Sequence, residues 1–209
     1  MLSVQENNKR IAKNTLVLYV RMLFLMVISL YTSRVILQAL GVEDFGIYNA
    51  VGGFVAMFAV ISKSLSSTAS RFLNYEMGKG NWDKLSRVFS TTLTIHVLLA
   101  ILIAVLAEAF GIWFVNQKMV IPPERLVAAN WVFQFSILTF CFNLITVPYH
   151  AAIIAHEKMS VFAYISIFEG VGKLLICYGV MVSPIDKLVF YALLMFLIQF
   201  IVNDIIIFF

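Results

Sequence analysis

Long apolar runs dominate the chain, and charged or turn-forming residues separate them. Six runs reach about 20 mostly apolar residues, the length that an α-helix needs to cross a bilayer. Apolar side chains surround these runs instead of alternating with a period of two, which favours helices over the strands of a barrel. The predicted helices span residues 14–40, 45–66, 88–115, 126–155, 159–182 and 187–209. The pattern therefore predicts an all-α integral membrane protein, a bundle of six transmembrane helices.

The segments between the runs are short and contain residues that end helices. Gly41, Pro122 and Pro184 are examples, and each fits a turn between two spans. Residues 1–13 are polar, and the apolar run that follows is about twice as long as the core of a signal peptide. We therefore expect the first helix to remain in the mature protein as an anchor.

Composition supports the membrane assignment. Hydrophobic residues make up 62% of the 209 residues and charged residues 12%. A soluble domain carries about 25% charged and about 45–50% apolar residues. A soluble fold of this length has too little interior for so many apolar side chains, so the surplus is expected to face membrane lipids.

The basic residues predict how the bundle is oriented. The net charge is +4, but the basic residues form no dense stripe, so a nucleic acid partner is not expected. Cytoplasmic loops are enriched in Lys and Arg. With the N-terminus inside, nine basic residues fall on the inner side and three, Lys118, Arg125 and Lys187, on the outer side. The nine are Lys9, Arg10, Lys13, Lys63, Arg71, Lys79, Lys84, Arg87 and Lys158. We expect a multi-pass protein of the bacterial cytoplasmic (inner) membrane with a cytoplasmic N-terminus.

The sequence contains no arrangement of residues that predicts catalysis. It has no nucleophile beside a base at helical spacing, no phosphate-binding P-loop and no carboxylate pair suited to acid–base chemistry. Cys141 and Cys177 lie inside apolar runs, where cysteine is usually a small hydrophobic residue. We therefore expect neither an enzyme nor a cofactor or metal site.

Arg21 is the most informative charge within a predicted span. Ionisable residues at membrane depth cost about 2.5–3.5 kcal/mol each on insertion scales, so each is a candidate for function. Asn14 lies seven residues before Arg21 and Thr32 eleven after it. At about 100° per residue, the three point within about 20° of one another and form a polar stripe. The stripe predicts a cation held for an anionic substrate; a structural salt bridge or snorkelling to the interface is the alternative.

Three further charged residues within the predicted spans are candidates for the site. Arg34 is near the outer end of the first helix, where snorkelling or a pair with Asp44 would explain it as well as a role in substrate binding. Glu169 and Lys173 have the i, i+4 spacing and the order that favour an intrahelical ion pair. That pair either neutralises itself to lower the cost of insertion or faces a cavity, and the sequence leaves both open.

In the fourth predicted helix, Asn143, Thr146 and His150 recur on one face beside Pro148. Polar side chains of this kind often join two helices within a membrane. We interpret this face as a contact between helices.

Three stretches of the chain resemble a known family. They are LGVEDFGIYNAVGG at 40–53, SRFLNYEMGKGNWDKLSRVFST at 70–91 and VPYHAAIIAHEKMSVFAY at 147–164. Their patterns of glycine, aromatic and basic residues are similar to those of polysaccharide flippases of the MOP (multidrug, oligosaccharidyl-lipid, polysaccharide) superfamily.

The resemblance implies a fold of two six-helix lobes that rock about a central cavity. Residues 1–209 match the N-terminal lobe, and the final apolar run lacks the flanking charges of a natural span, so we expect a C-terminal lobe that this sequence does not contain. Family members carry cationic residues in the first helix facing the cavity, and Arg21 matches them by position. Together with the residues singled out above from their charge and spacing, the cavity candidates are Arg21, Asn14, Thr32, Arg34, Glu169 and Lys173.

The implied substrate is an oligosaccharide linked to undecaprenyl diphosphate, flipped to the periplasmic leaflet for lipopolysaccharide (O-antigen) or capsule synthesis. A glycan polymerase or glycosyltransferases are the implied protein partners. Cationic residues suit a diphosphate, and arginine can bind it in a bidentate manner.

Two alternatives stay open at the level of sequence. A multidrug exporter of the same superfamily would favour acidic residues in the cavity, to bind cationic drugs and protons. A membrane-embedded glycan-processing enzyme would need a large loop or a cluster of polar catalytic residues.

Overall fold

The computed structural model describes residues 4–155 and 159–208. Within these ranges it does not describe the side chains of residues 4–11, 13, 14, 17, 61–63, 66, 155, 159, 160 and 162. The described residues are almost entirely helical and contain no strand. The helices are α1 (Val4–Ala56), α2 (Ala59–Gly78), α3 (Trp82–Leu106), α4 (Ile112–Gln117), α5 (Leu126–Ile145), α6 (Val147–Ala155), α7 (Met159–Val182) and α8 (Lys187–Phe208).

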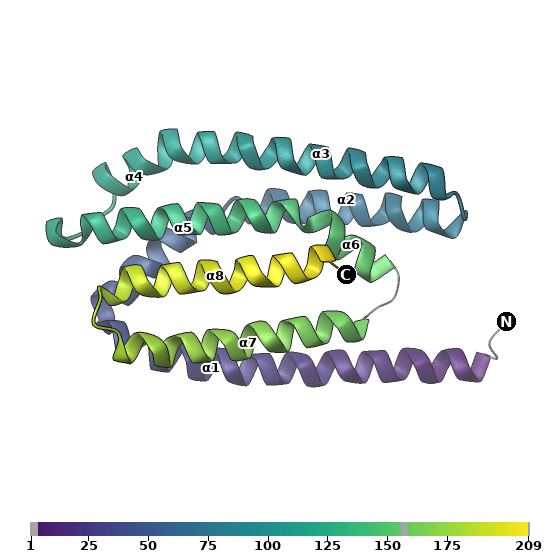
Figure 1. Cartoon of the computed structure of the whole chain (residues 1–209), viewed down its shortest axis with the longest axis horizontal. Helices are drawn as coiled ribbons and strands as arrows, with labels where there is room; N and C mark the ends of the chain where they lie inside the picture. Colours follow the sequence, from purple (N-terminus) through teal and green to yellow (C-terminus); the bar gives the residue numbers. More distant parts are fainter. Residues whose placement is uncertain (1–3, 156–158, 209) are drawn as a thin grey trace.

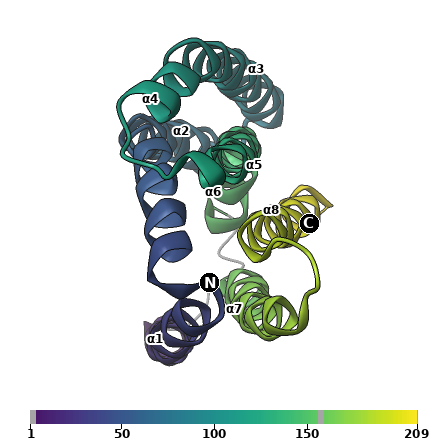
Figure 2. The ribbon, with the colours of Figure 1, turned by 90° about the vertical axis from the view of Figure 1, so that its left-hand side faces the viewer.

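Gly41 divides α1 into two parts that run in different directions. Its φ of 81° lies in the left-handed region, which glycine adopts without the steric cost that other residues pay. The first part of α1 lies beside α7, and the second part leads away from it towards α2 and α3 (Figures 1 and 2). Because of this turn, α1 contributes residues to both sides of the bundle.

The remaining helices run back and forth along the same axis (Figure 1). α7 packs against α1 and α8, α8 packs against α5, and α5 packs against α3. The described chain makes six successive passes along this axis. The first part of α1 forms the first pass, and the second part of α1 together with α2 forms the second.

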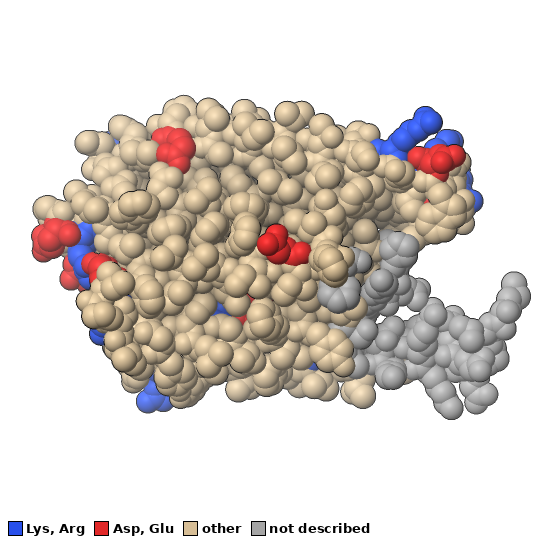
Figure 3. Space-filling view, viewed as in Figure 1, with Lys and Arg blue, Asp and Glu red and all other residues tan. Residues whose placement is uncertain are grey.

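The surface of the bundle fits a bilayer. Charged side chains gather at the two ends, and a broad belt with few charges lies between them (Figure 3). Five helical stretches of the described chain are long and apolar enough to cross a membrane: Leu18–Ala56, Trp82–Gln117, Pro123–Ile145, Ala163–Val182 and Lys187–Phe208. The predicted all-α integral membrane fold is confirmed.

The helix predicted at 45–66 is wrong in its bounds. The chain is already helical from Val42, and the helix breaks at Met57 and Phe58 before α2 continues to Gly78. The α2 segment contains Lys63 and Arg71, so its apolar run ends long before the helix does. Hydropathy locates the apolar part of a helix, whereas backbone hydrogen bonds continue past it.

Two other predicted helices also differ at their ends. The third begins at Trp82 instead of residue 88, because Asn81 caps it by accepting a hydrogen bond from the backbone N–H of Lys84 at 3.1 Å. The first begins by Val4, earlier than the predicted residue 14. The bounds predicted for 159–182 agree with α7, and α8 begins at Lys187 as predicted.

The predicted helix 126–155 is interrupted at Thr146 and continues as α6, which is turned away from α5 (Figure 1). Pro148 explains the break, because proline has no N–H to donate and fits the first turn of a helix. At this break Thr146 donates to Asn203 of α8 at 3.2 Å, and Asn203 donates to Asn143 at 3.0 Å. Asn143 and Thr146 thus form the predicted contact between helices.

A cluster of ionic contacts closes the end of the bundle opposite the N-terminus. Arg125 forms ion pairs with Asp44 and, at 2.6 Å, with Asp186, and so connects three successive turns of the chain. The carboxylate of Asp44 is buried, so it needs this partner. Arg125 therefore takes the place beside Asp44 that the sequence left open for Arg34, and of the explanations offered for Arg34 the pair with Asp44 is wrong.

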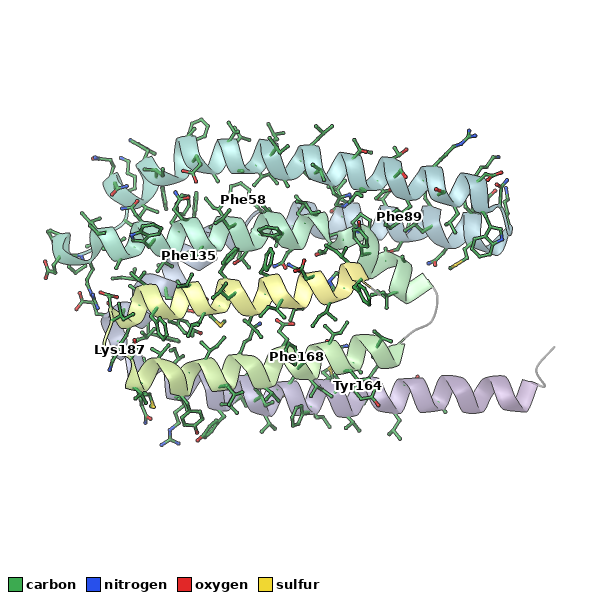
Figure 4. The ribbon with its side chains drawn as sticks, in the orientation of Figure 1. Phe58, Phe89, Phe135, Tyr164, Phe168 and Lys187 are labelled. Atoms are coloured by element: carbon green, nitrogen blue, oxygen red, sulfur yellow. The ribbon has the colours of Figure 1, made fainter. Side chains whose placement is uncertain are left out.

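The fold allows the predicted orientation to be tested. Lys79 lies in the turn between α2 and α3, at the end where the N-terminus lies, and Lys118 follows α4 at the opposite end, where Lys187 also lies (Figures 1 and 4). In a variant without native cysteines, Lys118→Cys should react with an impermeant thiol reagent in intact cells. Lys79→Cys should react only after the membrane is opened. Labelling of position 79 and protection of position 118 in intact cells would contradict a cytoplasmic N-terminus.

Candidate functional site: a charged cavity between α1, α7 and α8

A cavity of about 390 Å³ opens between the two parts of α1 and the helices α7 and α8. Its volume falls within the range of about 300–1,000 Å³ that small-molecule sites occupy. The polar side chains that line it are Arg21, Ser29, Thr32, Ser33, Asn49, Ser166, Glu169 and Lys173. A lining of this kind inside a membrane bundle is suited to water or a polar ligand, and not to lipid chains.

The first part of α1 presents one face to this cavity. Arg21, Leu25, Ile28 and Thr32 follow one another at spacings of three or four residues, which places them on the same side of a helix. Val27 and Leu30 point elsewhere and are about two-thirds exposed, as expected of side chains that face lipid. Arg21 and Thr32 of the predicted stripe therefore line the cavity.

The other members of the predicted site differ in position. The side chain of Asn14 lies outside the described residues, so its place in the stripe stays a prediction. Arg34 is exposed and does not line the cavity, and it makes no ion pair with another described residue. The structure thus separates Arg34 from Arg21.

Glu169 and Lys173 line the cavity from α7 and bind each other. The ammonium of Lys173 donates to Oε1 of Glu169 at 2.5 Å, and the two side chains are 34% and 26% exposed. The ion pair and the cavity-facing position, which the sequence left as alternatives, occur together. Glu169 and Arg21 line the same cavity, and the carboxylate attracts the guanidinium electrostatically.

Gly170 brings α7 close to α1 beside these charges. A Cβ atom at this position would lie 2.7 Å from Cδ2 of Leu25, which is closer than real Cβ contacts. The absence of a side chain therefore lets the helix that carries Glu169 and Lys173 approach the helix that carries Arg21.

The described residues of the lining carry one excess positive charge. Arg21 and Lys173 contribute two positive charges, and Glu169 contributes one negative charge. A cavity with low-dielectric walls concentrates the field of such a charge. The arrangement is suited to an anion that exchanges with the carboxylate of Glu169.

Sequence reasoning missed several polar groups of the cavity. Asn49 belongs to the second part of α1, and the turn at Gly41 brings it back to the cavity, where its amide donates to the carbonyl of Phe45 at 2.7 Å. Ser29 and Ser33 share the cavity face with Thr32, and Ser33 donates to the carbonyl of Ser29 at 2.9 Å. The spacing of three residues between Ser29 and Thr32 was a signal that could have been used.

Comparison with known proteins gives two matches. The family model MatE matches residues 18–178, a range that includes Arg21, Glu169 and Lys173. A stretch of 125 residues is 26% identical to the uncharacterised membrane protein EpsK of Bacillus subtilis (strain 168). That stretch covers 60% of this chain and 25% of the length of EpsK. No solved structure shows a significant match.

The contact between Glu169 and Lys173 predicts a particular pattern of stability. Removing one partner leaves the other charge inside the membrane bundle uncompensated, whereas removing both avoids that cost. The single changes Glu169→Gln and Lys173→Met should each lower the folded yield and the melting temperature in detergent, and the double change should restore much of the loss. Equal losses in all three variants would mean that each group is hydrated independently and that the pair is not structural.

Proposed function

Because the chain belongs to the MatE family of membrane transporters, within the MOP superfamily, we propose that it forms one lobe of a flippase. The proposed substrate is an oligosaccharide linked to undecaprenyl diphosphate, which the complete protein moves across the cytoplasmic membrane for surface polysaccharide synthesis. The observation that carries the proposal is the pair of cations, Arg21 and Lys173, on one cavity within the membrane belt. We propose that the diphosphate binds between them.

The chemistry of the two cations suits a diphosphate. Arginine offers a planar set of N–H donors that can bind two phosphate oxygens at once, and lysine offers a compact point charge. Hydroxyl groups of Ser29 and Thr32 lie on the same face as Arg21 and can contribute neutral hydrogen bonds. Charges are rare on the face of the membrane belt that Figure 3 shows, so this face offers a diphosphate few other binding sites.

Glu169 gives the cavity a way to bind and release the anion. Without a ligand, its carboxylate neutralises Lys173 directly and acts on Arg21. An entering diphosphate has to compete with the carboxylate of Glu169 for these two cations. This competition weakens the binding of the diphosphate enough to permit its release, which a transporter requires.

The excess positive charge argues against a multidrug exporter of the same superfamily. Such a protein would hold cationic drugs, and a cavity with two cations and one carboxylate would repel them. The matched stretch covers a quarter of EpsK, so the full transport pathway is proposed to include a second lobe. Glycan polymerase or glycosyltransferase partners belong to the same proposal, as does a cytoplasmic N-terminus in the inner membrane.

Substitution of Arg21 tests the proposed function. Arg21→Ala should abolish complementation of surface polysaccharide in a flippase-deficient cell, because the cavity loses its bidentate phosphate ligand. It should remain in the membrane, since deleting a cation lowers the cost of insertion. Arg21→Lys keeps the charge and should retain partial function. The measurement is glycan level per unit of membrane protein, with the complete gene expressed.

Arg34→Ala is the matched control, because Arg34 lies on the same helix but outside the cavity. It should complement as well as the wild type. Wild-type glycan levels from Arg21→Ala at equal abundance would refute substrate binding by Arg21 and leave it a structural residue.

A further inference from the structure

A second cavity, of about 320 Å³, adjoins the charged one. It lies between the second part of α1, α5 and α8, and the two cavities share Tyr48, Lys173 and Met195. Among the described residues that line it, Lys173 is the one that carries a charge. A ligand whose charged part binds beside Lys173 can therefore extend into a neighbouring space that has a different chemistry.

The lining of this second cavity combines aromatic rings with amides and hydroxyls. The aromatic side chains are Tyr48, Phe135, Phe140 and Phe196, and the neutral polar ones are Ser136, Thr139, Asn143 and Gln199. Figure 4 shows Phe135 on the side of α5 towards α8, where its ring stacks on Phe196 with centroids 5.9 Å apart. Flat rings contact the apolar C–H face of a sugar, and amides and hydroxyls match its hydroxyl groups.

Part of this hydrogen-bonding capacity is unused. Within the described chain, the side chains of Gln199 and Ser136 make no hydrogen bond. Asn143 accepts from Asn203 at 3.0 Å through its oxygen, and its own N–H groups donate to no described residue. These three side chains are half-buried and border the cavity, so their unused donors and acceptors are open to a ligand within it. Neutral donors and acceptors of this kind suit a polar, uncharged ligand.

We propose that this second cavity is the binding site for the sugar that is attached directly to the diphosphate of the carrier lipid. The inference rests on the proposed function, and it assigns the two parts of the substrate to two adjoining sites. The diphosphate binds at Arg21 and Lys173, and the first sugar ring lies against Phe135 and Phe196. A sugar joined to phosphate through a single oxygen must bind next to the phosphate site, and the shared Lys173 provides that adjacency.

Binding of two defined carriers to the purified protein, expressed from its complete gene, tests this assignment. The probes are undecaprenyl diphosphate and undecaprenyl diphosphate bearing one N-acetylglucosamine, titrated in detergent. Trp131 stacks on Phe135 at 5.7 Å, so tryptophan fluorescence should report the occupied sugar site. The wild type should bind the sugar-bearing carrier about tenfold more tightly than the bare carrier, as one or two added hydrogen bonds would give.

The double variant Ser136→Ala/Gln199→Met removes the unused polar groups and preserves much of the side-chain volume. It should lose most of the preference for the sugar-bearing carrier and bind the bare carrier with unchanged affinity, which also shows that it is folded. Leu197→Met is the matched control, because this residue lies on α8 outside both cavities and should leave both affinities unchanged.

Equal affinity of the wild type for both carriers would overturn the sugar site while leaving the proposed function intact. An equal loss of affinity for both carriers in the double variant would also overturn it, since Ser136 and Gln199 would then be structural. Failure of the wild type to bind either carrier would refute the proposed function, and the sugar site with it.

Discussion

An ionised side chain inside a bilayer must find an opposite charge or water, and this requirement shapes the bundle. At one end, Arg125 holds Asp44 and Asp186 together, so the buried carboxylate is compensated. Within the belt, Lys173 and Glu169 compensate each other and face a cavity. Both contacts place opposite charges together, and the second does so beside a polar space that helices enclose. This position makes the cavity suitable for a charged ligand.

The turn at Gly41 gives that space its third wall. If α1 continued straight, Tyr48 and Asn49 would project beyond the end of the bundle and could not meet α7. Because the chain turns at a positive φ, these residues line the cavity opposite Glu169 and Lys173. Tyr48 also borders the adjoining aromatic cavity, so one turn contributes to both sites. The geometry of the proposed substrate path thus depends on a single backbone conformation that favours glycine.

The amino-acid sequence predicted the class of fold and much of the charged site, because both follow from the energetics of burial. Apolar length located α7 and the start of α8 correctly, and helical spacing put Arg21 and Thr32 on one face. The predicted second helix was wrong, since hydropathy carries no signal for the break at Met57 and Phe58. The roles assigned to Arg21, Glu169 and Lys173 stay predictions.

Contacts between distant segments could not be predicted from one sequence. Arg125 lies 81 residues from Asp44 and 61 from Asp186, and no local pattern links them. Gln199 is a single amide in an apolar helix, and only the packing of α5 against α8 shows that it shares a cavity with Ser136. Periodicity describes the faces of one helix, whereas a site between helices depends on which faces meet.

The face of α1 that carries Arg21 borders a polar cavity within the membrane bundle, and we expect this cavity to be filled with water. Cysteine accessibility measures this directly, in a complete protein whose native cysteines have been replaced. Ser29→Cys lies on the cavity face, and Val27→Cys lies at the same depth about 200° around the helix, where the native side chain is 66% exposed. Ser29→Cys should react with a small hydrophilic thiol reagent, and Val27→Cys should not. Equal protection of both positions, or reaction of Val27→Cys alone, would show that this face of α1 does not border an aqueous cavity.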